Sequence, residues 1–236
     1  NVSFNAVLKF DHFQDRSLVT EEVLFRQFSF DYGHSNLLGI AFDGGIGQNV
    51  ISLKNMNSSD PHKAGEFVKD AQSFFVFLSG TKKWGSFSGS FKMQLDSQDK
   101  LNTDAEDGTL SLSSLGAKMR WEKFRLNARL DSKSTTFKET YKDYESTIID
   151  TGMTFSWTPW IFGLGFNNFD QKYKEPDPSS NIVLKIKKDE LSLDAKYAYS
   201  GSTILGTGLK QIKQASSDAL RSYSENQISF QYIWMF

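Results

Sequence analysis

Cysteine is absent from the sequence, and proline occurs only 4 times in 236 residues. Without cysteine the chain cannot form disulfides, thiolate nucleophiles or cysteine-ligated metal sites. Because proline is scarce and no Gly/Ser tract interrupts the chain, no segment has the composition of an interdomain linker. We therefore predict a single domain that spans residues 1–236.

Long hydrophobic runs are also absent. No stretch approaches the roughly 18 consecutive apolar residues that a membrane-spanning helix needs, so a helical membrane protein is excluded. The mean hydropathy of -0.44 would suit a soluble protein, but strands of a membrane barrel alternate and never accumulate hydropathy in a window. The net charge of -1 provides no basic field for binding nucleic acid.

Aromatic residues, by contrast, are abundant. The chain has 21 phenylalanines, 8 tyrosines and 5 tryptophans, which together make up 14% of the sequence. A soluble domain of this size rarely uses so many phenylalanines, whereas a membrane barrel needs aromatic side chains for its lipid-facing band and its interfacial girdles.

Apolar and polar residues alternate along most of the chain with the period of a β-strand, in which successive side chains point to opposite faces. The last ten residues are the most regular, since Ile228, Phe230, Tyr232, Trp234 and Phe236 fall on one face. The same reading predicts twelve strands, at residues 2–11, 21–32, 37–47, 72–80, 87–96, 108–121, 124–131, 146–157, 160–169, 182–186, 191–199 and 227–236.

Two of these segments are irregular. Arg26 falls among apolar residues of segment 21–32, and segment 108–121 changes phase near Ser113 and Ser114. A β-bulge, a position at the barrel rim or a misjudged register would explain Arg26. A β-bulge would explain the change of phase, because the extra residue shifts the alternation by one position.

The predicted connections alternate between short and long. Short ones fall near 33–36, 80–85, 121–123, 157–160 and 187–190, and long polar ones near 13–20, 48–70, 97–108, 132–145, 170–180 and 200–224. This order predicts an all-β, antiparallel up-and-down barrel with an even number of strands and both termini at the same end. Twelve is the expected count within a range of 10–14, because residues 48–54 and 201–211 could add two strands.

The end of the chain resembles the assembly signature of Gram-negative outer-membrane β-barrels, in which a last strand of alternating apolar residues ends on phenylalanine. Ile228, Phe230, Tyr232, Trp234 and Phe236 fit its positions. The resemblance implies a transmembrane barrel in the bacterial outer membrane, with periplasmic termini and short turns and with long extracellular loops. It also implies outer-membrane lipid, lipopolysaccharide and the barrel-assembly machinery as partners. A soluble ligand-binding barrel with an apolar interior is the alternative.

If the apolar face meets lipid, the opposite face lines the interior. The predicted pore-lining residues are Lys92, Arg125, Arg129, Asp131, Asp150, Lys185, Lys187, Asp194 and Lys196. Unpaired basic residues would favour anions or acidic sugars, since rings of charge set pore selectivity, whereas basic residues paired with the aspartates would form a structural ladder. We expect a channel for passive diffusion of ions or small hydrophilic solutes, without a cofactor or a metal.

Two other functions remain open from the residues alone. A barrel enzyme would need a histidine as general base, and His12 beside Asp11 or His62 near Asp60 could supply one. No nucleophile elbow or metal-binding histidine pair accompanies them, so we expect no catalysis. A barrel closed by internal ion pairs could instead serve as an adhesin, a receptor or a partner in a secretion complex.

Overall fold

The computed structural model describes the backbone of residues 2–14, 20–37, 39–54, 67–100, 107–200 and 203–234. Side chains are described for 26–34, 39–52, 72–99, 107–200 and 203–234. The described residues form a twelve-stranded sheet in which every strand pairs with its sequence neighbours. The strands are β1 (Val2–Gln14), β2 (Thr20–Leu37), β3 (Ile40–Lys54), β4 (Phe67–Trp84), β5 (Phe87–Lys100), β6 (Gly108–Trp121), β7 (Phe124–Phe137), β8 (Tyr144–Trp157), β9 (Trp160–Tyr173), β10 (Lys185–Ser200), β11 (Thr203–Ser216) and β12 (Tyr223–Trp234).

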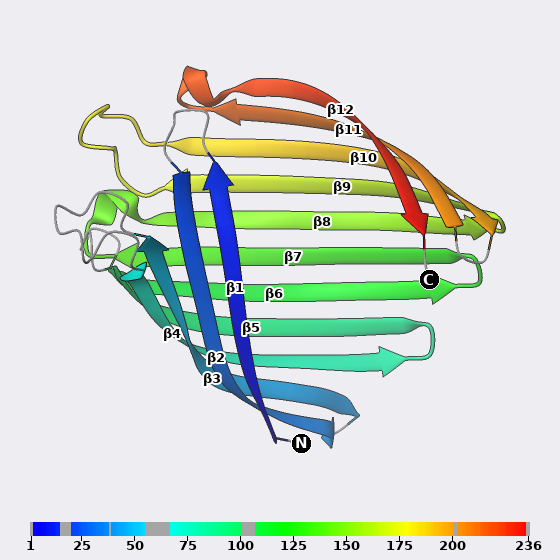
Figure 1. The fold of residues 1–236 in the computed structure, drawn as a ribbon, viewed down its shortest axis with the longest axis horizontal. Helices are drawn as coiled ribbons and strands as arrows, with labels where there is room; N and C mark the ends of the chain where they lie inside the picture. Colours follow the sequence, from blue (N-terminus) through cyan, green and yellow to red (C-terminus); the bar gives the residue numbers. More distant parts are fainter. Residues whose placement is uncertain are drawn as a thin grey trace.

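The sheet curls back on itself. Strands β4 to β11 form a curved wall, and β1 to β3 cross in front of it, with β12 bending over from the other side (Figure 1). All neighbouring strands are antiparallel, and β1 and β12 are the two edges of the sheet. None of the helices among the described residues is long and apolar enough to cross a membrane. The predicted up-and-down topology and strand count are thus confirmed.

Short turns gather at one end of the sheet, which we call the turn end, and longer connections at the other, the loop end. Two-residue turns join β4 to β5 at Gly85–Ser86 and β6 to β7 at Glu122–Lys123. Gly85 and Glu122 have φ angles of 58° and 48°, the left-handed conformation that tight hairpin turns require. By register, Val2 at the start of β1 and Trp234 at the end of β12 also lie at the turn end.

The convex face of the wall is apolar. A continuous ladder of paired residues crosses six strands on this face, and all of its members are exposed large hydrophobics: Leu126, Met153, Leu164, Leu193, Leu209 and Ile228. All 5 tryptophans of the chain end or begin strands at the turn end, where they form one rim of the apolar band: Trp84, Trp121, Trp157, Trp160 and Trp234. Such a rim is the expected arrangement for an aromatic girdle at a membrane interface.

No sizeable hydrophobic core underlies the sheet among the residues whose side chains are described. Phe75 and Ile212 are the large apolar residues buried there, whereas more than thirty others remain exposed. A soluble protein that exposed so much apolar surface would aggregate or bind a partner through it. The distribution therefore favours a lipid environment for the convex face over the soluble-barrel alternative, whose apolar residues would point inward.

Two errors in the predicted connections change which segments are strands. The turn expected at 187–190 does not form, because the backbone pairs without a break from Lys185 to Ala198 and makes one strand, β10. The long connection expected at 200–224 contains β11. The two errors cancel in the strand count. The other strands also extend into the predicted loops, because their polar residues pair as regularly as the apolar ones.

Neither irregular segment contains the expected shift in alternation. Strand β6 keeps an unbroken register with both neighbours, so Ser113 lies on the same face as Leu115. Arg26 stays on the face of Phe28, since β1 and β2 also pair without a shift. Its guanidinium donates a hydrogen bond to the hydroxyl of the buried Ser52, at 3.0 Å. A register shift does occur beside Ser52, where β3 meets β4.

The last strand has the predicted facing. Ile228, Phe230, Tyr232 and Trp234 alternate on the face that continues the apolar ladder, through their pairing with β11. Their exposed fractions lie between 57% and 84%, as expected for an edge strand with an apolar face. Phe236, the last member of the proposed assembly signal, lies outside the described residues.

Candidate functional site

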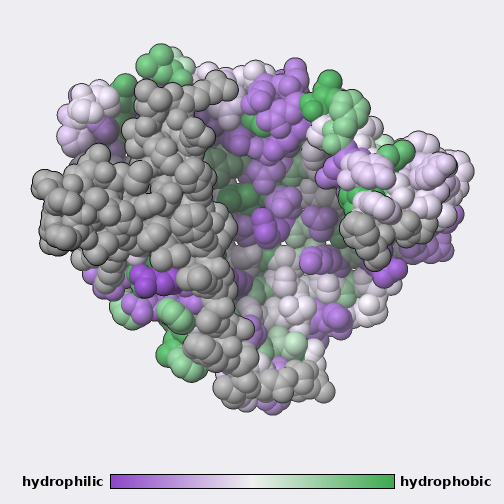
Figure 2. All heavy atoms as spheres, viewed as in Figure 1, coloured by the Kyte–Doolittle hydropathy of each residue, from purple (hydrophilic) through white to green (hydrophobic). Residues whose placement is uncertain are grey.

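The concave face of the sheet is polar. Hydrophilic side chains line the hollow that opens between the two sides of the curled sheet (Figure 2). Strand β7 shows the origin of this surface most clearly, since its alternate residues from Arg125 to Lys133 are all polar and face the hollow. Between them, Leu126, Ala128 and Leu130 belong to the convex face.

A basic cluster lies on this concave wall near the turn end. Lys118 and Arg120 of β6 and Arg125 of β7 line a cavity of about 700 Å³. Arg120 and Arg125 are direct cross-strand partners, a placement that destabilises a sheet when the charges are alike and uncompensated. Neighbouring serines supply the rest of the polar lining, among them Ser86, Ser88, Ser90 and Ser114.

The charges of the basic cluster are not neutralised. Across the part of the chain whose side chains are described, Lys118, Arg120 and Arg125 have no carboxylate within ion-pair distance. All three residues are exposed, so their charged groups are accessible to solvent. The cluster is therefore a local positive field on a surface that faces a water-accessible hollow.

Arg129, four residues beyond Arg125 along β7, is different. Its Nε lies 3.2 Å from Asp131 Oδ2, and its Nη2 lies 3.4 Å from Asp150 Oδ2. The predicted alternative of a structural ion-pair ladder thus applies to Arg129 and its two aspartates. Closer to the loop end, Glu190 likewise forms two ion pairs. Its Oε1 lies 2.5 Å from Lys188 Nζ, and its Oε2 lies 2.7 Å from Lys210 Nζ.

Three further predicted residues lie on the concave face. The Lys92 ammonium is 5.6 Å from the centroid of the Phe77 ring. Asp194 projects over Gly163, where any added Cβ would collide with its carboxylate, and Lys196 lies against Gly206. These glycines make space on the wall for longer polar side chains from the neighbouring strand.

Lys185 and Lys187 are not on this face. They share the convex face with Leu191 and lie between that residue and the loop end of β10, with Lys187 opposite Asp170. The prediction that they face the interior is wrong, because it relied on a turn at 187–190. Without that turn, residues of equal parity keep the same face along the whole of β10.

Lys118 and Arg120 were missed by sequence reasoning. The presumed phase change near Ser113 obscured the alternation that follows it. The signal is present in the chain, since Lys118 and Arg120 alternate with Ala117, Met119 and Trp121 in a regular strand pattern. Placing Ser113 on the convex face and Ser114 on the concave face, without a shift between them, recovers the observed facing.

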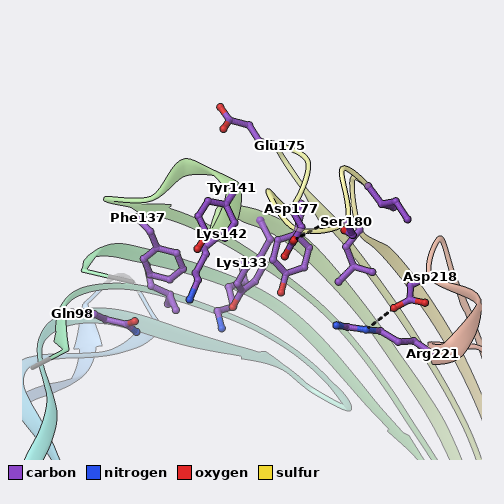
Figure 3. A pocket seen from close by; sticks show the side chains of 15 residues that line it. Gln98, Lys133, Phe137, Tyr141, Lys142, Glu175, Asp177, Ser180, Asp218 and Arg221 are labelled. Atoms are coloured by element: carbon purple, nitrogen blue, oxygen red, sulfur yellow. Dashed lines mark hydrogen bonds and ion pairs between the residues drawn. The ribbon is translucent and has the colours of Figure 1, made fainter. Parts of the chain in front are cut away.

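A second cavity, of about 540 Å³, lies at the loop end and is called here the mouth cavity. Figure 3 shows side chains from β7, β9 and the loops that surround it, with Lys133, Lys142 and Arg221 directing their nitrogens toward its interior. Phe137, Tyr141, Tyr144 and Tyr173 contribute aromatic surface to the same lining.

The loops around the mouth cavity are tied to the sheet by buried polar groups. Asp143, only 5% exposed, accepts a hydrogen bond from the Phe137 backbone N–H at 2.5 Å and pairs with the Lys174 ammonium at 3.8 Å. Thr135, fully buried, donates from its hydroxyl to the Tyr144 carbonyl and accepts from the Tyr144 N–H. Buried polar groups that satisfy one another in this way rigidify a site.

The connection between β9 and β10 has its own anchor. The Asp177 carboxylate accepts hydrogen bonds from the Ser179 hydroxyl, the Ser179 N–H and the Ser180 N–H. These bonds, the one from the Ser179 hydroxyl first, lower the pKa of Asp177 below its usual value. Asp177 is therefore ionised at neutral pH and is engaged with its own loop.

The structure bears on the metal and enzyme predictions only in part. No group of three or more potential metal-ligating side chains occurs among the described residues. His12 has no described side chain, and His62 lies outside the described residues, so neither proposed general base can be assessed. His34 is part of β2, not of the predicted turn at 33–36.

Comparison with known proteins bears on the fold. No protein-family model matches the chain, and no curated protein matches it by sequence. A loop-deleted variant of OmpT, an outer-membrane protein of Vibrio cholerae, matches with a TM-score of 0.51 and 7% identity over 99% of this chain and 98% of that one. The anion-selective porin from Comamonas acidovorans matches with a TM-score of 0.51 and 10% identity over 98% of both chains. At these identities the likeness concerns the fold alone, and the chain has the up-and-down strand architecture of outer-membrane β-barrels.

Proposed function

We propose that the chain forms an outer-membrane channel for passive diffusion of small hydrophilic solutes, with a preference for anions. The observation that carries the proposal is the basic cluster, in which Lys118, Arg120 and Arg125 face the hollow without carboxylate partners. Fixed charge on a pore wall raises the local concentration of permeant ions of opposite sign. The apolar convex face supports the membrane location, since it presents the band that lipid requires.

The orientation follows the same proposal. The turn end and both termini would face the periplasm, and the loops around the mouth cavity would face outward, as in barrels of this class. Solutes would then pass the mouth cavity first and the basic cluster second. The name of the Comamonas acidovorans porin is in keeping with anion selectivity. No covalent chemistry is part of the mechanism.

The test is electrical. The full chain, folded in detergent and added to a planar lipid bilayer, is expected to give discrete conductance steps. In a KCl gradient, the reversal potential should have the sign that corresponds to chloride passing more easily than potassium. A folded protein that inserts but stays silent would contradict the channel and favour the closed-barrel alternative, in which internal ion pairs such as Arg129 with Asp150 occlude the lumen.

A further inference from the structure

The mouth cavity has the size and composition of a binding site. Its volume of about 540 Å³ lies within the range of 300–1,000 Å³ that is usual for small-molecule pockets. Aromatic and aliphatic side chains line it together with a small number of charged groups, a composition typical of such pockets.

The carboxylates that line the mouth cavity already have partners. Asp177 is bound to its own loop, and Asp218 pairs with Arg221 at 3.2 Å. The Glu175 carboxylate accepts from the Thr140 hydroxyl at 2.5 Å and points away from the cavity in Figure 3. Among the described residues, none of these carboxylates forms an ion pair with Lys133.

Lys133 is the central cation. Its ammonium lies 5.1 Å from the centroid of the Tyr144 ring, and within the described part of the chain it has no ion-pair partner. A cation held over an aromatic ring keeps its outer side available to an anion. Any carboxylate that reached this ammonium would form a charge-assisted hydrogen bond, which is stronger than a neutral one.

Aromatic rings lie beside this cation. Tyr144 and Tyr173 are direct cross-strand partners whose ring centroids are 5.6 Å apart, at an interplanar angle of 45°. Together with Phe137 and Tyr141 they give the cavity apolar faces within reach of the Lys133 ammonium. Since buried polar anchors fix the surrounding loops, the rings and the cation are positioned before any ligand arrives.

We propose that the mouth cavity binds small molecules that carry a carboxylate on a ring with an apolar face, such as a sugar acid or an aromatic acid. The carboxylate pairs with Lys133, and the ring packs against Tyr144 and Tyr173. The site rests on the proposed channel function and deepens it. It would concentrate one class of anion at the outer entrance, before the basic cluster, whereas the basic cluster alone distinguishes only the sign of charge.

Isothermal titration calorimetry on the full chain in detergent tests this site. Glucuronate and benzoate are the two probes. The one that binds more tightly shows whether the site prefers a sugar acid or an aromatic acid. Glucose, which lacks the charge, and acetate, which lacks the ring, are the ligand controls. Binding of a ring carboxylate that clearly exceeds both controls supports the site. Equal binding of acetate, or no binding of either probe, would overturn it.

Two variants assign the binding to the named residues. Lys133→Met keeps an apolar stem and removes the charge, so we expect it to weaken the better probe by about tenfold or more. Lys187→Met makes the same change on the convex face, where the lysine is exposed, and should leave binding unchanged. If both variants bind equally well, Lys133 is not the anchor and the proposed site is wrong.

The outcome separates this site from the channel itself. Calorimetry in detergent does not depend on conduction, so binding without conductance would contradict only the channel function. Conductance without ring-carboxylate binding would contradict only the mouth site.

Discussion

Replacing both Arg120 and Arg125 with glutamate is expected to turn an anion-preferring pore into a cation-preferring one. The two arginines are cross-strand partners that line the same cavity, so the double substitution changes the local charge by four units in one place. At 0.1 M salt the Debye length is about 10 Å, which leaves such a cluster only partly screened for an ion that passes within that distance. The reversal potential in a KCl gradient should change sign, and the effect should shrink as salt increases.

The convex face supplies a matched control for this result. Lys185→Glu combined with Lys187→Glu makes the same change in net charge on residues that share the face of Leu191. Because these lysines do not face the hollow, we expect the selectivity to stay anionic. If the control variant inverted the selectivity and the Arg120/Arg125 variant did not, the assignment of the two faces would be wrong.

The second large effect concerns the apolar band. Leu193→Arg should destabilise the protein folded in lipid by about 2–4 kcal/mol, which is the cost of an arginine near the bilayer midplane on a lipid-facing strand. Leu193 lies at the middle of β10 (Lys185–Ser200), belongs to the apolar ladder and is 49% exposed. Urea titration of folding into lipid vesicles measures the difference.

The neighbouring residue gives the comparison at the same depth. Ser192 points to the concave side, where its hydroxyl donates to the Gly165 carbonyl at 3.4 Å. Ser192→Arg would lose that long hydrogen bond but place its charge in the hollow, so we expect a distinctly smaller loss of stability. Equal losses for the two variants would mean that Leu193 does not face lipid.

Much of the fold can be predicted from the sequence, because successive residues of a strand point to opposite faces and apolar residues then recur at every second position. The regular segments, such as residues 124–131 and 160–169, lie within strands with the expected faces. The strand ends could not be predicted, because toward the loops the convex face also becomes polar and the alternation disappears. Thr147, Asp170 and Lys187 form one such paired ladder, with no apolar member to mark the face.

The candidate site was predictable in part for the same reason. Arg125 and Arg129 alternate with Leu126 and Ala128, so their common face follows from the sequence. Their different environments do not, since pairing of Arg129 with Asp150 depends on the register between β7 and β8. The mouth cavity could not be predicted, because its lining comes from three connections and several strands that only the folded chain brings together.

The central claim is that the polar face encloses water and the apolar face contacts lipid. Because the chain has no native cysteine, labelling of single introduced cysteines measures directly which face is accessible to water. Cysteines placed singly at positions 125 to 129, in protein folded into lipid vesicles, should react with a charged, water-soluble thiol reagent in a two-residue period. Reaction at positions 125, 127 and 129, with protection at 126 and 128, is the predicted result. Reaction at 126 and 128 with protection at the other three would contradict the account.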